Sequence, residues 1–282
     1  EAKEKGDLTE ISGIGKSRRK LLQELGINKI KDLANFNPRE LDEKLSEITH
    51  QDTNFASHII LQAKTQMSGK AQRINDNNCL PEIKLAPGIL IYDIESDCDA
   101  KEDFLHGFVS INRNKDGVLD IHNAKYHPLL MIHKDLEIKQ WKRLIKKLET
   151  YKNCPILHYG ETEAVFLRRF SRKYLSNENE IQILENRLID IHLRVRKHWL
   201  LPVKSYGLKV IAEWVGFKWS QKNSDGARAL LWWRQWKDSR ANKKRNSNSL
   251  KKIFTYNKDD CLATWSVAEW LLIEDNKNAN SN

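Results

Sequence analysis

The spacing of apolar residues divides the chain into a helical first part and a mixed second part. Up to about Met67, apolar positions recur at helical intervals, and Gly, Asn and Pro interrupt them at short distances. These intervals predict short helices near residues 8–11, 17–25, 38–45 and 53–67. Residues 69–88 are polar and contain two prolines, so we expect a linker there.

From residue 89 onward, strands and helices are expected to alternate. Runs rich in β-branched and aromatic residues predict strands, and apolar positions at helical spacing predict helices. The expected strands are 89–96, 106–113, 118–124, 154–159 and 188–191, and the expected helices are 137–151, 165–174, a basic one near 194–198, 205–217 and 256–272. The predicted domains are therefore a helical one over 1–68 and an α/β one over 89–274, with a disordered tail at 275–282.

Two carboxylates stand inside the first expected strand. Asp93 and Glu95 are two residues apart, so their side chains point to the same face of a strand. Two like charges on a mostly buried strand repel each other and lose hydration, which costs stability unless a cation neutralises them. Mg²⁺ and Mn²⁺ prefer such oxygen ligands. A strand end at which both acids reach water explains this pair equally well when it is taken alone.

Further carboxylates stand at element boundaries. Glu163 lies where an expected strand gives way to a helix, which suits a metal ligand at the sheet edge; Glu161 is the alternative in register, and an acid that complements the helix dipole is the non-functional interpretation. Tyr256 and Asp260 are four residues apart and share a helix face. A phenol beside a metal-binding carboxylate can orient or help deprotonate a water, whereas an Asn-capped helix with an exposed acidic pair is the alternative. Asp190 is expected to support the site or to cap the following helix.

The charge balance favours a polyanionic partner. Lys and Arg number 48 against 38 Asp and Glu, a formal net charge of +10, and such an excess attracts nucleic acid. The first helices resemble the helix-hairpin-helix nucleic-acid-binding motif at Gly13, Gly15, Leu22, Gly26 and Ile27. Glycines let the backbone approach a phosphate, the N–H groups of a helix start bind the anion, and Lys16 and Arg18 add countercharge. A helical hairpin whose glycines only make a tight turn is the alternative.

Two other segments are candidates for nucleic-acid contact. Lys204, Ser205 and Lys209 stand at an expected helix start, where they either touch a phosphate backbone or are simply solvated. Between residues 222 and 252, Trp232 and Trp236 share a helical face with Ala229 and are expected to pack on the sheet. Trp233 with Arg234 is the better surface pair for stacking on bases and following phosphates. The Asn-, Ser- and Lys-rich part of this stretch is expected to form a loop.

Three acidic motifs together resemble those of the DEDDy 3′-5′ exonucleases of the RNase H-like superfamily. They are Asp93-x-Glu95, the run from His158 to Glu163, and Tyr256-x-x-x-Asp260. Residues 200–209 and 212–219 are similar to the C-terminal domain of predicted RecB-like nucleases, where this domain follows a RecB-type nuclease region and a helix-hairpin-helix segment. The first Met is Met67, which fits a fragment without such an upstream part. Many DEDD enzymes carry Asp where Glu163 stands and often Asn where Tyr159 stands.

The resemblance implies a metal-dependent nuclease. Asp93, Glu95, Glu163 and Asp260 would hold two Mg²⁺ or Mn²⁺ ions, and Tyr256 would orient the attacking water. The implied activity is 3′-5′ exonuclease cleavage of single-stranded DNA. The alternatives are a non-catalytic nucleic-acid-binding module with a degenerate RNase H-like fold and an RNase D-like enzyme that processes RNA 3′ ends. An upstream RecB-like domain or a helicase is the expected protein partner.

A cytoplasmic location is expected. No apolar run is long enough to cross a bilayer, and no signal peptide is recognisable. The four cysteines are scattered, without a Cys-x-x-Cys pair, so we expect reduced, packing cysteines rather than a zinc site or disulfides.

Overall fold

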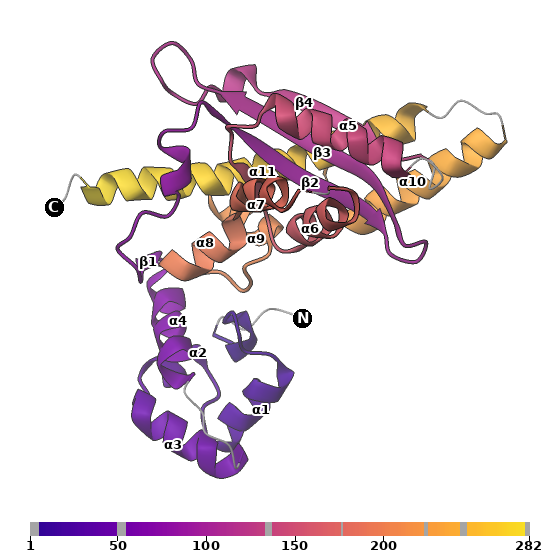
Figure 1. The fold of residues 1–282 in the computed structure, drawn as a ribbon. Helices are drawn as coiled ribbons and strands as arrows, with labels where there is room; N and C mark the ends of the chain where they lie inside the picture. The colour runs from indigo at the N-terminus through magenta and orange to yellow at the C-terminus, as the bar shows by residue number, and fades with distance from the viewer. Residues whose placement is uncertain are drawn as a thin grey trace. The chain divides into compact units, whose positions relative to one another are not determined.

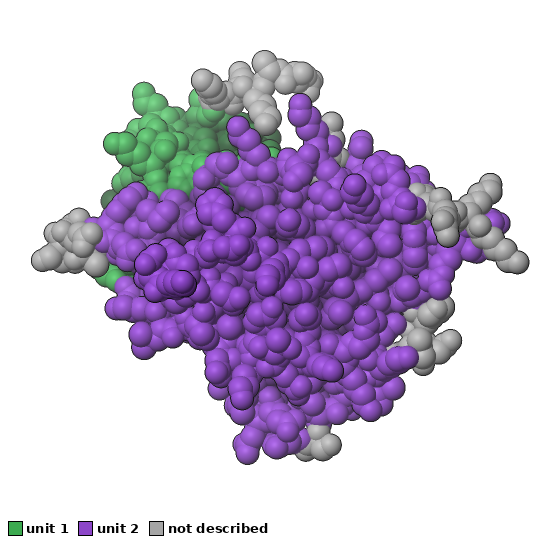
Figure 2. Space-filling model, turned by 90° about the horizontal axis from the view of Figure 1, so that it is seen from above, with its two compact units in different colours: residues 1–77, 194–214 green, residues 78–193, 215–282 purple. Residues whose placement is uncertain are grey.

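The computed structural model describes residues 6–49, 55–132, 137–175, 177–222, 225–242 and 247–279. The chain divides into two compact units, coloured separately in Figure 2. Residues 1–77 and 194–214 form unit 1, and residues 78–193 and 215–282 form unit 2. No helix within the described ranges combines the length and the apolar character that a membrane crossing requires.

Unit 1 begins with a group of short helices, which confirms the predicted helical N-terminal region. The helices are α1 (Lys16–Glu24), α2 (Ile30–Ala34), α3 (Pro38–Thr49) and α4 (Ala56–Ser68) (Figure 1). Leu22, Leu33, Leu41 and Ile59 are buried in their shared core. The helix predicted near Leu8 is only a 3₁₀ turn, Leu8–Glu10, because the chain turns again directly after it.

Unit 1 also contains a segment from much later in the chain. The two-residue strand β1 (Gln72–Arg73) pairs antiparallel with β7 (Trp199–Leu200), and α9 (Leu208–Trp214) follows. The buried Gln62 side chain on α4 donates a hydrogen bond to the Leu201 carbonyl oxygen at 2.6 Å. The helix α8 (Ile191–His198) leads from unit 2 into this segment. Residues 194–214 thus belong with the helical unit, although the sequence places them inside the α/β domain.

Unit 2 contains a mixed five-stranded sheet in the order β4-β3-β2-β5-β6, which confirms the predicted fold class. The strands are β2 (Gly88–Asp97), β3 (Glu102–Asn112), β4 (Lys125–Leu130), β5 (Ile156–His158) and β6 (Leu188–Asp190). β2 runs antiparallel to β3 and parallel to β5. The strand predicted at 118–124 is wrong: Ile121–Asn123 forms a 3₁₀ turn, because the Asp120 carboxylate accepts hydrogen bonds from the next backbone N–H groups.

Helices cover both faces of this sheet. They are α5 (Glu137–Thr150), α6 (Thr162–Tyr174), α7 (Glu178–Asn186), α10 (Gly226–Ala241) and α11 (Ser247–Ala279). Leu90 and Tyr92 of β2 pack with α5, α6 and α7 in one apolar cluster. On the other side α11 contacts β2 and β3, and a second cluster joins β3 with α10 and α11 (Figure 1).

The C-terminal helix is longer than the sequence predicts. It begins at Ser247 instead of Tyr256 and reaches Ala279. The disordered tail predicted at 275–282 is therefore wrong for residues 275–279, while 280–282 lie outside the described residues. The loop predicted before this helix is wrong from Ser247 onward, and residues 223–224 and 243–246 lie outside the described residues.

Candidate metal centre

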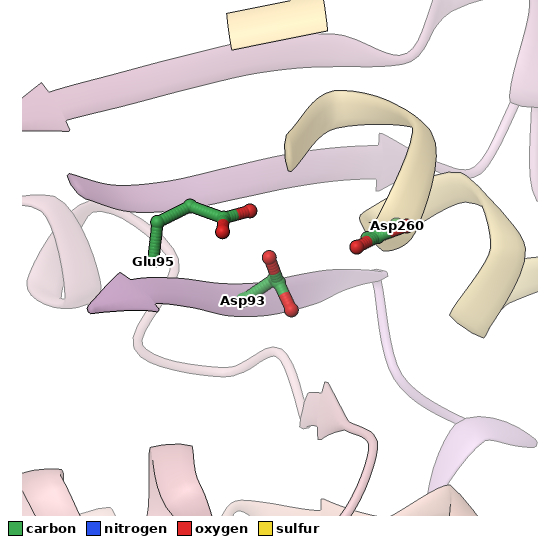
Figure 3. A group of neighbouring side chains, drawn as sticks. All are labelled: Asp93, Glu95 and Asp260. Atoms are coloured by element: carbon green, nitrogen blue, oxygen red, sulfur yellow. The ribbon is translucent and has the colours of Figure 1, made fainter. Parts of the chain in front are cut away.

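Three carboxylates from two elements of unit 2 converge on one point. Ile89, Leu90 and Ile91 are fully buried and fix β2 in the middle of the sheet. The alternation of a strand then turns Asp93 and Glu95 together toward α11, where Asp260 points back at them (Figure 3). One oxygen from each of Asp93, Glu95 and Asp260 lies within 4.8 Å of the other two.

Glu163 lies beside this group without joining it. In the first turn of α6, its side chain is only 4% exposed, and its Oε1 accepts a hydrogen bond from the Ile94 backbone N–H at 3.3 Å. Its Oε2 is buried and has no hydrogen-bond partner among the described residues. Burial raises the pKa of Glu163 to about 7. Glu161, the alternative in register, is exposed and stands before the helix.

The electrostatics of this group fit a bound cation. Burial raises the pKa of Asp93 well above its usual range, and the charges of Glu95, Asp260 and Glu163 raise it further. Buried carboxylates that oppose each other's ionisation are costly until a positive charge neutralises them. The buried Oε2 of Glu163, which has no hydrogen-bond partner among the described residues, would likewise be stabilised by a cation. A donor set made entirely of carboxylate oxygens suits Mg²⁺ or Mn²⁺.

Helix α11 places two further side chains at the acids. Tyr256 is 5% exposed, and burial, the Asp260 charge and a hydrogen bond to Asp260 all raise its pKa. The exposed acidic pair considered from the sequence is wrong, because Asp259 and Asp260 are 4% and 8% exposed. Asp259 accepts hydrogen bonds from the Ser220 backbone N–H and hydroxyl at 2.8 and 3.0 Å, which anchors the preceding segment to α11.

Sequence reasoning missed two side chains that touch the acids. Asn257 is fully buried and donates from Nδ2 to Asp93 Oδ2 at 2.6 Å. Trp219 donates from its indole Nε1 to Asp260 Oδ1 at 2.7 Å. Asn257 had a detectable signal, because it interrupts the apolar stripe that Ile253 and Cys261 form at four-residue spacing on α11. Trp219 stands outside regular structure, so no periodicity marks it.

Asp190 connects loops rather than joining the group of acids. Its Oδ1 accepts hydrogen bonds from the backbone N–H groups of Gly160 at 3.0 Å and His192 at 2.9 Å. The first bond holds the turn between β5 and α6, and the second satisfies the start of α8. Asp190 therefore fixes the turn from which Glu163 projects.

The predicted base-stacking role of Trp233 is wrong. Its side chain is fully buried, with its ring stacked on Phe104 at a centroid distance of 4.6 Å. The helix α10 buries Ala229 and Trp233, which share a face at four-residue spacing, and leaves Trp232 and Trp236 partly exposed. Arg234 is exposed, and its Nη2 is engaged by the carboxylates of Asp97 and Asp99 at 2.8 and 2.7 Å, which would compete with a phosphate for this guanidinium.

The glycine-rich turn of unit 1 joins the 3₁₀ turn Leu8–Glu10 to α1, so a full helix stands only on its C-terminal side. Gly13 has a φ of +92°, in the left-handed region, and Gly15 precedes the first residue of α1, the exposed Lys16. Arg18 donates from Nη1 to the Gly13 carbonyl oxygen at 2.7 Å, and its guanidinium lies 4.6 Å from the centroid of the Phe55 ring. The helix-start residues predicted later in the chain differ in exposure: Lys204 is exposed, whereas Ser205 and Lys209 are half-buried.

Residues 90–272 match the family model described as the RNase H superfamily. The chain belongs to the RNase H superfamily. All four candidate ligands, Tyr256 and Asn257 lie inside the matched span. Residues 7–79 match the model of the RecG wedge domain. Comparison with curated proteins and with solved structures gave no match.

The superfamily and the acidic group together indicate nuclease-type chemistry that uses a divalent metal. The two matched domains also imply interaction with nucleic acid.

Proposed function

We propose that this RNase H-like protein is a two-metal-ion nuclease of the DEDDy type, acting as a 3′-5′ exonuclease on single-stranded DNA. The observation that carries the proposal is the convergence of Asp93, Glu95 and Asp260 within 4.8 Å in an RNase H-like domain. Glu163, with one buried oxygen lacking a partner among the described residues, supports a further ligand beside them.

The acids would hold Mg²⁺ or Mn²⁺. Asp93, Glu95 and Asp260 form the main ligand group, and Glu163 adds a fourth carboxylate. When bound, such ions lower the pKa of a water and stabilise the charge on the leaving oxygen in phosphodiester hydrolysis.

The protein's own groups position the reactants. The Tyr256 hydroxyl donates its proton to Asp260, so its oxygen is placed to accept a hydrogen bond from the attacking water and so to orient it. Trp219 and Asn257 restrain Asp260 and Asp93 through neutral N–H donors, so the carboxylates are aimed before substrate arrives.

Unit 1 would bind the phosphate backbone through its helix-hairpin-helix segment. Gly13, Gly15, Lys16 and Arg18 are the proposed contacts, with Lys204, Ser205 and Lys209 as further ones. Burial, and after it the charges of Arg196 and Arg18, lower the pKa of His58, so both arginines bring positive charge to this side chain. The backbone phosphates of a bound nucleic acid would neutralise these charges, and binding would release counterions from the nucleic acid.

A cleavage assay tests the proposed activity. Purified protein with Mn²⁺ is incubated with end-labelled single-stranded DNA and RNA whose 3′ ends are free or blocked. We expect stepwise shortening of DNA with a free 3′ end and resistance of the blocked strand. Asp93→Asn and Asp260→Asn should lower the rate at least about 100-fold, because each removes a metal ligand while preserving shape. Cleavage by Asp93→Asn at the unaltered rate would refute the assignment.

The two glutamates at the start of α6 provide a matched pair of variants. Glu163→Gln should lower the cleavage rate, whereas the exposed Glu161→Gln should cleave like the unaltered protein. Preferential shortening of RNA would instead favour the RNase D-like alternative.

A non-catalytic binding module remains the second candidate, because Glu163 lies outside the tight group of three acids. That candidate predicts binding to single-stranded DNA without cleavage.

For both candidate functions, Arg18→Ala should weaken binding to single-stranded DNA and reduce the slope of log affinity against log salt concentration by about 1.

A further inference from the structure

Asn257 occupies the space between α11 and the central strands. Its Nδ2 donates to Asp93 Oδ2 at 2.6 Å and lies 3.4 Å from both Glu95 Oε1 and the Asp93 carbonyl oxygen. At the other end of the amide, Oδ1 accepts a hydrogen bond from the Tyr126 hydroxyl at 2.8 Å. The side chain is fully buried, so both ends of the amide find their partners inside the protein.

The chemistry of these partners fixes which way the amide faces. In the cation-bound state Asp93 and Glu95 are ionised and only accept hydrogen bonds, so the NH₂ group must face them. The Tyr126 hydroxyl then has the amide oxygen in front of it and donates to it. Flipping the amide would place its oxygen against two carboxylates, which is electrostatically unfavourable.

Gly107 provides the room for this amide. It lies opposite Asp93 in the antiparallel register of β2 and β3. A Cβ added at Gly107 would lie 1.5 Å from Asn257 Oδ1, and the next nearest atoms, at 2.7 and 3.2 Å, also belong to Asn257. The strand therefore lacks a side chain at the place where the amide of α11 reaches the acids.

We propose that Asn257 is a positioning residue of the metal centre, with Tyr126 orienting its amide and Gly107 admitting it. Asn257 holds one oxygen of Asp93 and draws Glu95 toward the same nitrogen, which directs the remaining carboxylate oxygens to a cation. An amide is suited to this role because it supplies a donor without a charge, whereas a lysine would itself neutralise the acids and displace the metal. This inference rests on the proposed function.

Direct metal binding to the full chain tests the role of the amide. Binding of Mn²⁺ is followed by the loss of the electron paramagnetic resonance signal of the free ion, in the absence of nucleic acid. Asn257→Leu keeps a side chain of similar size without hydrogen bonds, and it should weaken Mn²⁺ binding about 10- to 100-fold. Tyr126→Phe should weaken it less. The double variant should match Asn257→Leu alone, because Tyr126 acts through Asn257.

Gly107 allows stability and metal binding to be separated. Gly107→Ala alone should lower both the melting temperature and the Mn²⁺ affinity, because the new methyl group displaces the amide. In Gly107→Ala with Asn257→Ala, the clash is gone, so the melting temperature should return to that of Asn257→Ala while the Mn²⁺ affinity stays low. Val267→Ala is the control, because it truncates another fully buried side chain of α11 that lies nearly three helical turns after Asn257. It should lower the melting temperature and leave Mn²⁺ affinity unchanged.

The outcomes distinguish the two proposals. If the unaltered protein binds Mn²⁺ and Asn257→Leu binds it equally well, or if the effects of Asn257→Leu and Tyr126→Phe simply add, the positioning role is refuted and the proposed function stands. If the unaltered protein binds no Mn²⁺, both proposals are overturned.

Discussion

His106 is a neutral histidine in the middle of the sheet. It is 1% exposed, the Tyr92 hydroxyl lies 2.6 Å from its Nδ1, and burial lowers its pKa to about 3. In the unfolded chain a histidine takes up a proton near pH 6.5. Between about pH 6.5 and pH 3 the unfolded state therefore binds a proton that the folded state excludes. The contribution of His106 to stability is complete above this window and is lost as the pH falls through it.

We expect this effect to be measurable by urea unfolding in the presence of a chelator. From pH 8 to pH 5, the free energy of unfolding of the unaltered protein should fall by about 2 kcal/mol more than that of His106→Gln. Comparing the two proteins removes the opposite contribution of Asp93 and Glu163, whose pKa values are raised. Parallel pH profiles for the two proteins would contradict the prediction.

At the scale of single residues, spacing reveals acids better than it reveals their partners. Asp93 and Glu95 could be placed on one face from strand alternation alone, and Tyr256 with Asp260 from helical spacing. The polar side chain of Asn257 within an apolar helix stripe is visible in the sequence, but the acids that Asn257 and Trp219 contact are not, because each contact is with a segment distant in the sequence. For Trp233 the spacing was misread by one position around α10: the sequence predicted an exposed side chain, and the structure buries it.

At the scale of elements, ion pairs connect α10 to the end of β2, the strand that carries Asp93 and Glu95. Arg234 on α10 binds Asp97, whose side chain is 3% exposed, and also the exposed Asp99. Asp97 is the last residue of β2, and Asp99 lies in the connection to β3. The hydrogen bonds from Arg234 hold the pKa of Asp97 at about 2. Because the acid is buried, loss of this partner leaves its charge without compensation.

Arg234→Met should therefore lower the melting temperature by about 2–4 °C, measured by calorimetry at neutral pH. Adding Asp97→Asn to Arg234→Met should recover part of the loss, because the uncompensated charge is then removed. Arg228→Met on the exposed side of the same helix is the control and should melt like the unaltered protein. Equal melting temperatures for Arg228→Met and Arg234→Met would show that the ion pairs of Arg234 contribute nothing to stability.

Most helices and strands could be predicted from the sequence, whereas their first and last residues were harder to predict. Long runs such as β2 and α5 follow from periodicity alone. The error at residues 118–124 has a local cause: Asp120 hydrogen-bonds its own following backbone and ends the extended conformation before Ile121. The early start of α11 at Ser247 was missed because Asn, Ser and Lys are common in loops, and packing of Ile253 against β3 overrides that preference.

At the scale of the whole molecule, unit 1 depends on two distant parts of the chain. The bond from Gln62 to Leu201 and the pairing of Arg73 with Trp199 join segments more than a hundred residues apart. No periodicity in the sequence signals such a return. The predicted boundary at residue 68 therefore could not include residues 194–214.

This arrangement predicts the behaviour of a shortened protein. A variant that lacks residues 1–77 loses α4 and β1, so residues 199–206 lose the side chain of Gln62 and the strand partner of β7. We expect limited proteolysis to cut this variant within 194–214 much faster than the intact chain, while 90–190 stays protected by its own sheet. Equal protection of 194–214 in both proteins would contradict the interdependence.

The length difference between β2 and β5 has a consequence for the stability of the sheet. β5 accompanies β2 at Leu90 and Ile91, so the backbone N–H of Ile94 extends past its neighbouring strand and bonds to Glu163 instead. Because Glu163 is 4% exposed, this strand donor is satisfied inside the protein. A variant with an apolar side chain at residue 163 would leave the N–H group without this acceptor, at a cost of about 1–3 kcal/mol that is unrelated to catalysis.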